Sequence, residues 1–150
     1  MTILPARHPE CGVQRSVAEL AAEAMYREIT LTPKPGLVDR DNSGAHQDMN
    51  FTVFMASIAA VAPWFSLFFN VGKETASLGG MQTLRAIRPT GLACEQAMFA
   101  ATGGVNTHKG GIFSLGLLCA AAGRLSQRDD ALPQRSLCNE TRLICTGIVE

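Results

Sequence analysis

Two polar, glycine-rich segments hold most of the residues in this chain that could do chemistry. Residues 32–49 read TPKPGLVDRDNSGAHQDM, and residues 101–111 read ATGGVNTHKGG. The first segment is much longer than the roughly four to six residues that usually connect elements in a compact domain. Long polar connections commonly carry binding or catalytic residues. The two segments are therefore the candidate functional site.

The first segment combines three carboxylates with three basic side chains. These are Asp39, Asp41, Asp48, Lys34, Arg40 and His46. Carboxylates this close in sequence can share Mg²⁺, and cations beside them suit a nucleoside triphosphate. The same composition is also typical of solvated turns, because Asp and Asn favour turns and glycine supplies positive φ. Asp48 is in addition a candidate N-cap for the helix that follows, so spacing leaves both interpretations open.

The second segment places four polar residues directly before an apolar helical pattern. They are Asn106, Thr107, His108 and Lys109. Backbone N–H groups at a helix start, the helix dipole and a lysine together indicate a phosphate cradle. The segment is not a P-loop, because Gly110 follows Lys109 where that motif requires Ser or Thr. An ordinary helix terminus with capping residues is the alternative.

Three further side chains are candidates because they can titrate. Glu95 interrupts an apolar helical pattern, and the helical period puts it on the face of Thr102, toward the second segment. A carboxylate there either points to water or is held inside for a purpose. His46 and His108 could each act as base, ligand or phosphate partner, since histidine changes charge near neutral pH. A structural role is the alternative for all three.

The composition argues against several classes of function. Lys plus Arg equals Asp plus Glu at 13 each, so the net charge gives no reason to expect nucleic acid or a membrane surface as partner. The five cysteines are odd in number and lack a Cys-x-x-Cys pair, which favours a reduced cytoplasm over disulfides or zinc. The first residues do not resemble a signal peptide, and the apolar run at residues 58–69 is too short to span a bilayer. We expect a cytoplasmic protein.

The apolar periodicity predicts an all-α fold, a compact multi-helix bundle with two functional polar loops. The expected helices span residues 17–30, residues 49 to about 63, and residues 73–87, 90–102, 108–125 and 133 to the end, with Pro63 kinking the second or starting a new segment. Arg88-Pro89 is predicted to separate two helices, because proline lacks the N–H that a helix needs. Gly103-Gly104 is a predicted helix stop. Residues 1–14 are predicted to be a flexible N-terminal arm, and residues 15–150 a single all-helical domain.

Taken together and in this order, the two segments resemble the triphosphoribosyl-dephospho-CoA synthase family, which serves citrate lyase and, in a sister branch, malonate decarboxylase. The resemblance rests on both segments and on residues 91–95, and it covers residues 17–125 in register. It implies an all-helical enzyme that takes ATP and 3'-dephospho-CoA and releases adenine. The triphosphoribosyl group is joined to a ribose hydroxyl of dephospho-CoA. The product is the precursor of the prosthetic group on the lyase's acyl carrier protein, which the enzyme would serve indirectly.

The resemblance also implies roles for individual residues. The catalytic set would be Asp39, His46, Asp48, Glu95 and His108. The phosphate- and substrate-binding set would be Lys34, Arg40, Asn106, Thr107 and Lys109. Asp39 and Asp48 would hold Mg²⁺ or stabilise a ribosyl cation, and Glu95 would be a base or a supporting carboxylate. Family members continue past the pattern present here, so the domain is expected to be incomplete relative to the family.

Two other classes of function stay open on the residues alone. One is a non-catalytic helical module that binds a nucleotide or CoA through the phosphate cradle. The other is an interaction module, in which the aromatic helix at residues 64–69 packs on a second copy as a homodimer.

Overall fold

Helices make up every regular element that the structure describes, which confirms the predicted all-α class. This computed structural model describes residues 9–45, 47–128, 134–146 and 148. Its elements are α1 (Pro9–Thr30), α2 (Phe51–Val61), the 3₁₀ helix η1 (Ala62–Trp64), α3 (Phe65–Glu74), α4 (Gly80–Thr102), α5 (Lys109–Leu125) and α6 (Gln134–Cys145).

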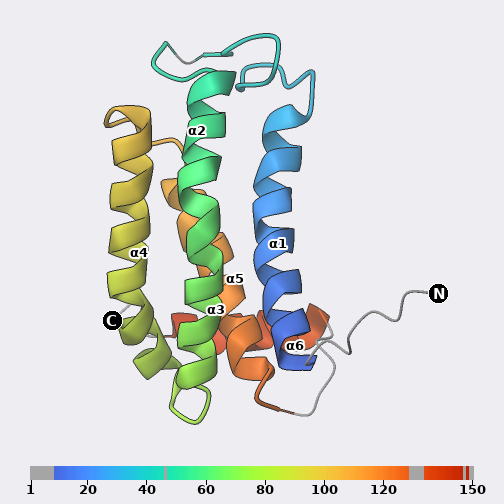
Figure 1. Cartoon of the computed structure of the whole chain (residues 1–150), viewed down its shortest axis with the longest axis vertical. Coiled ribbons are helices and arrows are strands. Elements are labelled where there is room, and N and C mark those ends of the chain that lie inside the picture. The colour runs from blue at the N-terminus through green and yellow to red at the C-terminus, as the bar shows by residue number, and fades with distance from the viewer. Residues whose placement is uncertain (1–8, 46, 129–133, 147, 149–150) are drawn as a thin grey trace, which may run out of the picture.

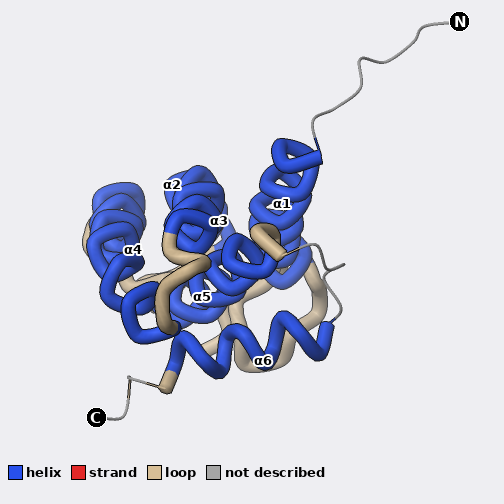
Figure 2. Tube along the Cα trace, turned by 90° about the horizontal axis from the view of Figure 1, so that it is seen from below, coloured by secondary structure: helices blue, strands red, loops and turns tan. Residues whose placement is uncertain are grey.

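The helices form a bundle around α5. Figure 1 shows α1, the α2–α3 run and α4 standing side by side, with α5 packed against them. Seen from below in Figure 2, α6 crosses the bundle on the far side of α5. The connections that precede α2 and α5 lie at one end of the bundle, and the α3–α4 turn lies at the other. Both polar segments therefore reach the same end.

Small residues allow α3 and α5 to approach each other closely. A Cβ atom at Gly72 would lie 1.9 Å from the carbonyl oxygen of Ala120, and one at Gly123 would lie 2.0 Å from that of Phe69. Both obstacles are backbone atoms, which no rotamer change removes. The apolar, glycine-containing sequence of α5 thus explains why it is the central helix, as its high apolar density predicts.

Pro63 begins a new segment, as predicted, within a nearly continuous run from Phe51 to Glu74. This run has 24 residues and a mean hydropathy of 1.8, so by length and composition it could cross a membrane, unlike the shorter stretch considered from sequence. Length and composition alone are weak evidence of a span. The buried side chains Ile58, Val61 and Phe65 belong to the core of the bundle.

A single helix, α4, passes through Pro89, so the predicted break at Arg88-Pro89 is wrong. Pro89 and Arg85, whose carbonyl group loses its N–H partner, are both exposed, so water can satisfy that carbonyl. On the opposite side Leu84, Ile87 and Cys94 are buried at helical spacing. Packing of this face outweighs the local cost of the proline.

Other helix boundaries also differ from the predictions. Helix α1 begins at Pro9 rather than Val17 and so overlaps the predicted arm of residues 1–14. The N-cap of α2 is Asn50, not Asp48, because the Asn50 side chain accepts a hydrogen bond from the Val53 N–H at 2.9 Å. The predicted helix at residues 73–87 is divided, since α3 ends at Glu74 and α4 begins at Gly80. The last helix ends at Cys145.

Two cysteines have the structural role expected from sequence. Cys94 and Cys119 are buried free thiols in the core. Burial raises the pKa of each to about 12, so both remain neutral at physiological pH. They act as small hydrophobic side chains.

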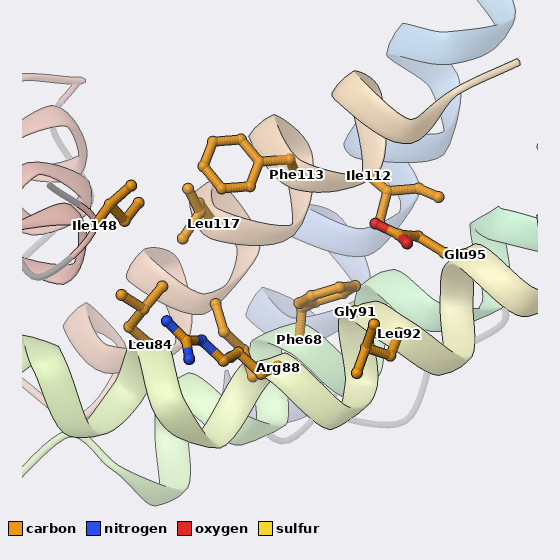
Figure 3. Close-up of a pocket in the computed structure, with 11 residues that line it drawn as sticks. Phe68, Leu84, Arg88, Gly91, Leu92, Glu95, Ile112, Phe113, Leu117 and Ile148 are labelled. Atoms are coloured by element: carbon orange, nitrogen blue, oxygen red, sulfur yellow. The ribbon is translucent and has the colours of Figure 1, made fainter. Parts of the chain in front are cut away.

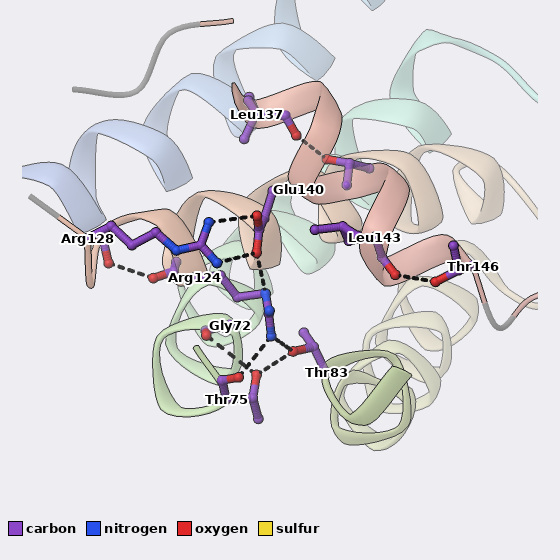
Figure 4. Close-up of polar contacts among 12 residues, drawn as sticks. Gly72, Thr75, Thr83, Arg124, Arg128, Leu137, Glu140, Leu143 and Thr146 are labelled. Atoms are coloured by element: carbon purple, nitrogen blue, oxygen red, sulfur yellow. Dashed lines mark hydrogen bonds and ion pairs between the residues drawn. The ribbon is translucent and has the colours of Figure 1, made fainter. Parts of the chain in front are cut away.

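A buried polar cluster joins four elements near the α3–α4 turn, at the end of the bundle opposite the polar segments (Figure 1). Figure 4 shows its contacts. The Nε of Arg124 donates to Glu140 at 2.7 Å, and its Nη1 donates to the Thr83 hydroxyl at 2.7 Å and the Thr75 carbonyl at 2.9 Å. Arg128 donates to both carboxylate oxygens of Glu140, at 2.9 and 3.2 Å. Burial opposes ionisation of Glu140, but the two guanidinium groups together hold its pKa below the ordinary value. The cluster thus ties α5 to α4, α6 and the turn after α3.

Candidate functional site

The carboxylate of Asp39 organises the connection between α1 and α2. Its Oδ2 accepts the Lys34 N–H at 2.8 Å, and its Oδ1 accepts the N–H groups of Asp41 at 2.7 Å and Asn42 at 3.0 Å. Only 1% of Asp39 is exposed. These backbone hydrogen bonds, that of Lys34 first, lower the pKa of Asp39, so the group is ionised at neutral pH. Asp39 therefore holds the loop together as an internal anion.

Two glycines allow the same loop to fold back on itself. Gly36 and Gly44 have φ of 79° and 58°, a region that glycine occupies at little cost. At Gly44 a Cβ would lie 2.4 Å from the carbonyl carbon of Gly36. The turn signals in the sequence are thus correct, and they coexist with a buried carboxylate.

Lys34 links this loop to the end of α1. Its Nζ donates to the carbonyl oxygen of Glu28 and lies 3.3 Å from the Glu28 carboxylate. Lys34 is 8% exposed, so most of its side chain is covered. The loop is consequently anchored at both Asp39 and Lys34.

The second segment ends one helix and starts another. Gly103 and Gly104 have φ of 66° and 90° and end α4, which confirms the predicted stop. The Thr102 hydroxyl donates to the Val105 carbonyl at 2.8 Å, and Asn106 Oδ1 accepts the Lys109 N–H at 3.2 Å. Helix α5 then begins without a hydrogen bond from a capping side chain at His108.

His108 is held by contacts from two neighbouring helices. Its Nδ1 lies 2.7 Å from the Ser57 hydroxyl of α2, which also accepts a hydrogen bond from Thr107 at 2.6 Å. Phe54 packs against the imidazole edge to face, with ring centroids 4.8 Å apart and planes at 81°. The His108 N–H donates to the Met98 sulfur of α4 at 3.2 Å. The ring orientation is therefore fixed before any ligand arrives.

The charge of Glu28 connects the two polar segments. Burial lowers the pKa of His108 below its ordinary value, and the Glu28 carboxylate offsets part of this shift. Glu28 also pairs with Lys34, so the same carboxylate acts on a residue of each polar segment. Segments far apart in sequence thus meet at one end of the bundle.

Glu95 lines an apolar groove of about 340 Å³ between α4 and α5. Figure 3 shows its carboxylate pointing across the groove toward Ile112 of α5, with Phe113 and Leu117 farther along. Arg88 is the other charged residue that lines it. Glu95 is half-buried, and Ile112 lies four residues after His108, so the groove begins close to the second segment.

The remaining predicted residues are spread around the loops. Arg40, Asp41 and Asp48 are exposed in the first segment, and Asn106 and Lys109 are exposed in the second. His46 lies outside the described residues. Within the part of the chain that the structure describes, no three His, Cys, Asp or Glu side chains are grouped to hold a metal ion. Asp39 already accepts three hydrogen bonds out of about four positions on a carboxylate. Asp39 is therefore engaged mainly by its own loop, with about one oxygen position left for a ligand.

Sequence reasoning missed two residues of the site, Ser57 and Glu28. Ser57 is fully buried and lies beside Ile58 on the apolar side of α2. A hydroxyl in such a position needs a partner, and this was the available signal. Glu28 had no comparable signal, because it resembles any exposed residue near a helix end.

Comparison with known proteins identifies the family. The model of the ATP:dephospho-CoA triphosphoribosyl transferase family matches residues 14–149. A probable 2-(5''-triphosphoribosyl)-3'-dephosphocoenzyme-A synthase from Albidiferax ferrireducens is 56% identical over 135 residues, which are 90% of this chain and 45% of the relative. The 2-(5''-triphosphoribosyl)-3'-dephosphocoenzyme-A synthases of Pectobacterium atrosepticum and Klebsiella pneumoniae are 51% and 50% identical over 133 residues, which are 89% of this chain and 44% of each relative.

The chain spans less than half the length of these relatives. No solved structure matches it. The family model, however, covers nearly the whole chain, including both polar segments and the helices that hold them. With this extent of matching and identities of about 50%, the chain belongs to the ATP:dephospho-CoA triphosphoribosyl transferase family.

Proposed function

We propose that this chain acts in the synthesis of 2'-(5''-triphosphoribosyl)-3'-dephospho-CoA from ATP and 3'-dephospho-CoA, with release of adenine. The observation that supports it most directly is the position of the two polar segments at the same end of the bundle, where the Glu28 carboxylate pairs with Lys34. Family membership supports the same reaction. The end of the bundle that carries both polar segments would bind the phosphate groups of the substrates.

The start of α5 is the proposed phosphate-binding element. Lys109 is exposed, and the first turn of α5 contains Gly110 and Gly111 and lacks a capping side chain at His108. A Cβ at Gly110 would meet nothing within 4 Å, so a ligand can approach the backbone there. The Lys109 N–H is already bound by Asn106, so the N–H groups of Gly110 and Gly111, together with the lysine side chain, would receive a polyphosphate.

Carboxylates would act where positive charge develops. Breaking an N-glycosidic bond passes through an oxocarbenium-like state that a nearby carboxylate stabilises. Asp48 is exposed and Glu95 is half-buried beside the second segment, so both could approach a substrate. Asp39 would act by shaping the loop that carries Arg40. His46 and Asn106 would contact substrate, as the resemblance implies.

Mg²⁺ belongs to this proposal as the ion that accompanies ATP, with Asp39 and Asp48 as its candidate protein ligands. One or two carboxylates are enough when substrate phosphates and water complete the coordination. The proposed location is the cytoplasm, where ATP is available and free thiols stay reduced. The acyl carrier protein of the lyase would be served indirectly, and a homodimer is a further possible assembly.

A non-catalytic nucleotide-binding module is the second candidate. It is favoured by the exposed Lys109 and the open backbone at Gly110, which can bind a phosphate without taking part in any chemistry. In this case the phosphate-binding end would retain affinity for ATP without adenine release.

Measurement of adenine release distinguishes these candidates. The wild-type chain is incubated with ATP, dephospho-CoA and Mg²⁺, and adenine is quantified by chromatography, with each component omitted in turn. Release that needs all three components supports the synthase, and saturable ATP binding without release supports the module. Absence of both overturns the proposal. Alanine at His108 should abolish release while the circular dichroism spectrum stays unchanged.

A further inference from the structure

We propose that Ser57 is a positioning residue that keeps His108 as a neutral imidazole protonated at Nε2, so that His108 meets the substrate as a hydrogen-bond donor and not as a base. The functional half of this inference rests on the proposed function. The protonation state does not, because it follows from contacts within the chain.

The direction of the hydrogen bonds assigns the proton. Thr107 donates to the Ser57 oxygen at 2.6 Å, and the Ser57 oxygen lies 2.7 Å from His108 Nδ1. Because Thr107 is the donor in its bond to Ser57, the single proton of the fully buried Ser57 hydroxyl is left for Nδ1. If Nδ1 carried the ring proton, Ser57 would have to donate to the Thr107 oxygen instead, which is the reverse of this bond. The hydroxyl therefore donates to Nδ1, and the ring proton is on Nε2.

The surroundings of the ring favour the same state. Phe54 covers the imidazole from α2, and burial disfavours its charged form. The charged group that acts on it is Glu28 of α1, which favours the protonated ring but already pairs with Lys34. This pairing reduces the tendency of the carboxylate to draw a proton to His108.

This state determines what His108 can do chemically. An imidazole whose Nδ1 is occupied and whose Nε2 is protonated cannot accept a proton from substrate, but it can donate a hydrogen bond. No partner for Nε2 is present among the described residues. The neighbouring Lys109 and the start of α5 favour anionic ligands, so the expected acceptor is a phosphate oxygen. Both ATP and dephospho-CoA carry such oxygens.

NMR of the imidazole nitrogens tests the protonation state directly. The full chain is labelled with ¹⁵N-histidine, its long-range ¹H–¹⁵N correlations are recorded above pH 7, and His108 is assigned by its loss in His108→Gln. The expected pattern is a protonated Nε2 and an unprotonated, hydrogen-bonded Nδ1. A protonated Nδ1, or an imidazolium at this pH, overturns the inference. Addition of ATP or of dephospho-CoA in separate samples identifies which phosphate shifts Nε2.

Three serine and threonine variants test the part played by Ser57. Ser57→Ala should shift the Nδ1 resonance and raise the pKa of His108, because the bond that favours the neutral ring is lost. Thr107→Val should leave Nε2 protonated, since Ser57 can still donate. The matched control is Ser66→Ala on α3, where Ser66 bonds the Pro63 carbonyl and does not contact His108. Unchanged Nδ1 and pKa in Ser57→Ala would refute the positioning role.

His108→Gln tests whether His108 acts as a hydrogen-bond donor or as a base. His108→Gln keeps an N–H donor near Nε2 but cannot exchange a proton, so it should retain adenine release within about tenfold of wild type. His108→Ala should lose about 100-fold or more. Equal losses in both variants would indicate a base and overturn the donor role. If the wild-type chain neither binds ATP nor releases adenine, the proposed function fails, and the NMR result alone decides the protonation state.

Discussion

At the scale of residues, the candidate site depends on side chains that bind the protein itself. Asp39, predicted from sequence to hold a metal ion or stabilise a cation, accepts three backbone N–H groups. Ser57, an inconspicuous serine in an apolar helix, fixes a histidine. The sequence indicated residue types that could do chemistry, but which of them bind other parts of the protein depends on partners that only the fold brings together.

Asp39→Ala should loosen the first segment without unfolding the bundle. The substitution leaves the N–H groups of Lys34, Asp41 and Asn42 without their acceptor, and unpaired backbone donors favour local opening. Hydrogen exchange of these three amides should therefore accelerate, while amides of α5 keep their protection. The control is Asp41→Ala, which removes an exposed carboxylate from the same loop. Equal protection of the three amides in wild type and Asp39→Ala would show that the carboxylate does not hold the loop.

At the scale of elements, sequence periodicity predicted most of the helices. The run before Gly103 and the helix after His108 were found because glycine signals and apolar spacing agree there. The continuous helix α4 was not predicted, because Pro89 was expected to end a helix by removing a hydrogen bond. Its exposed position, which allows water to replace that bond, is known only from the fold. The N-cap of α2 was predicted at Asp48 but is Asn50 for a related reason. Asp and Asn both cap helices well, so the path of the loop decides which residue caps.

The contact of α3 with α5 makes the identity of its glycines testable. Gly72→Ala forces a Cβ against the Ala120 carbonyl oxygen, so the free energy of unfolding should fall by about 3 kcal/mol. The matched control is Gly91→Ala on α4, where the nearest atom is Cζ of Phe68 at 4.0 Å. That variant should be as stable as wild type or gain up to about 1 kcal/mol through helix propensity. Urea denaturation followed by circular dichroism measures both, and similar values for the two variants would contradict the close approach.

At the scale of the whole molecule, the polar cluster around Glu140 connects α4, α5, α6 and the turn after α3. Glu140 is 3% exposed and pairs with Arg124 and Arg128. Removal of one partner from a buried ion pair lowers the free energy of unfolding strongly, because the other charge is left buried without a counter-charge. The contribution of the ion pair to stability should therefore depend on the ionisation of Glu140.

Glu140→Gln should lower the free energy of unfolding by about 3 kcal/mol at neutral pH, because it leaves Arg124 without its counter-charge. Since the folded-state pKa of Glu140 lies below the ordinary 4.5, this contribution is complete above that value and is lost as the pH falls through the folded pKa. The stability difference between wild type and Glu140→Gln should accordingly narrow between pH 7 and pH 3. Urea denaturation across this range provides the measurement, and a difference that stays constant with pH would exclude the ionised pair as its source.

The separation of the two polar regions has a consequence for how the sequence can change. The loops that carry Lys34 and His108 lie at one end of the bundle, and the cluster around Arg124 lies at the other. Substitutions far apart without shared partners have effects on stability that add to within about 0.5 kcal/mol. A mutation that improves packing around Arg124 can therefore compensate a destabilising change near His108 without altering the loops themselves. This independence allows the polar loops to diverge in sequence while the bundle stays folded.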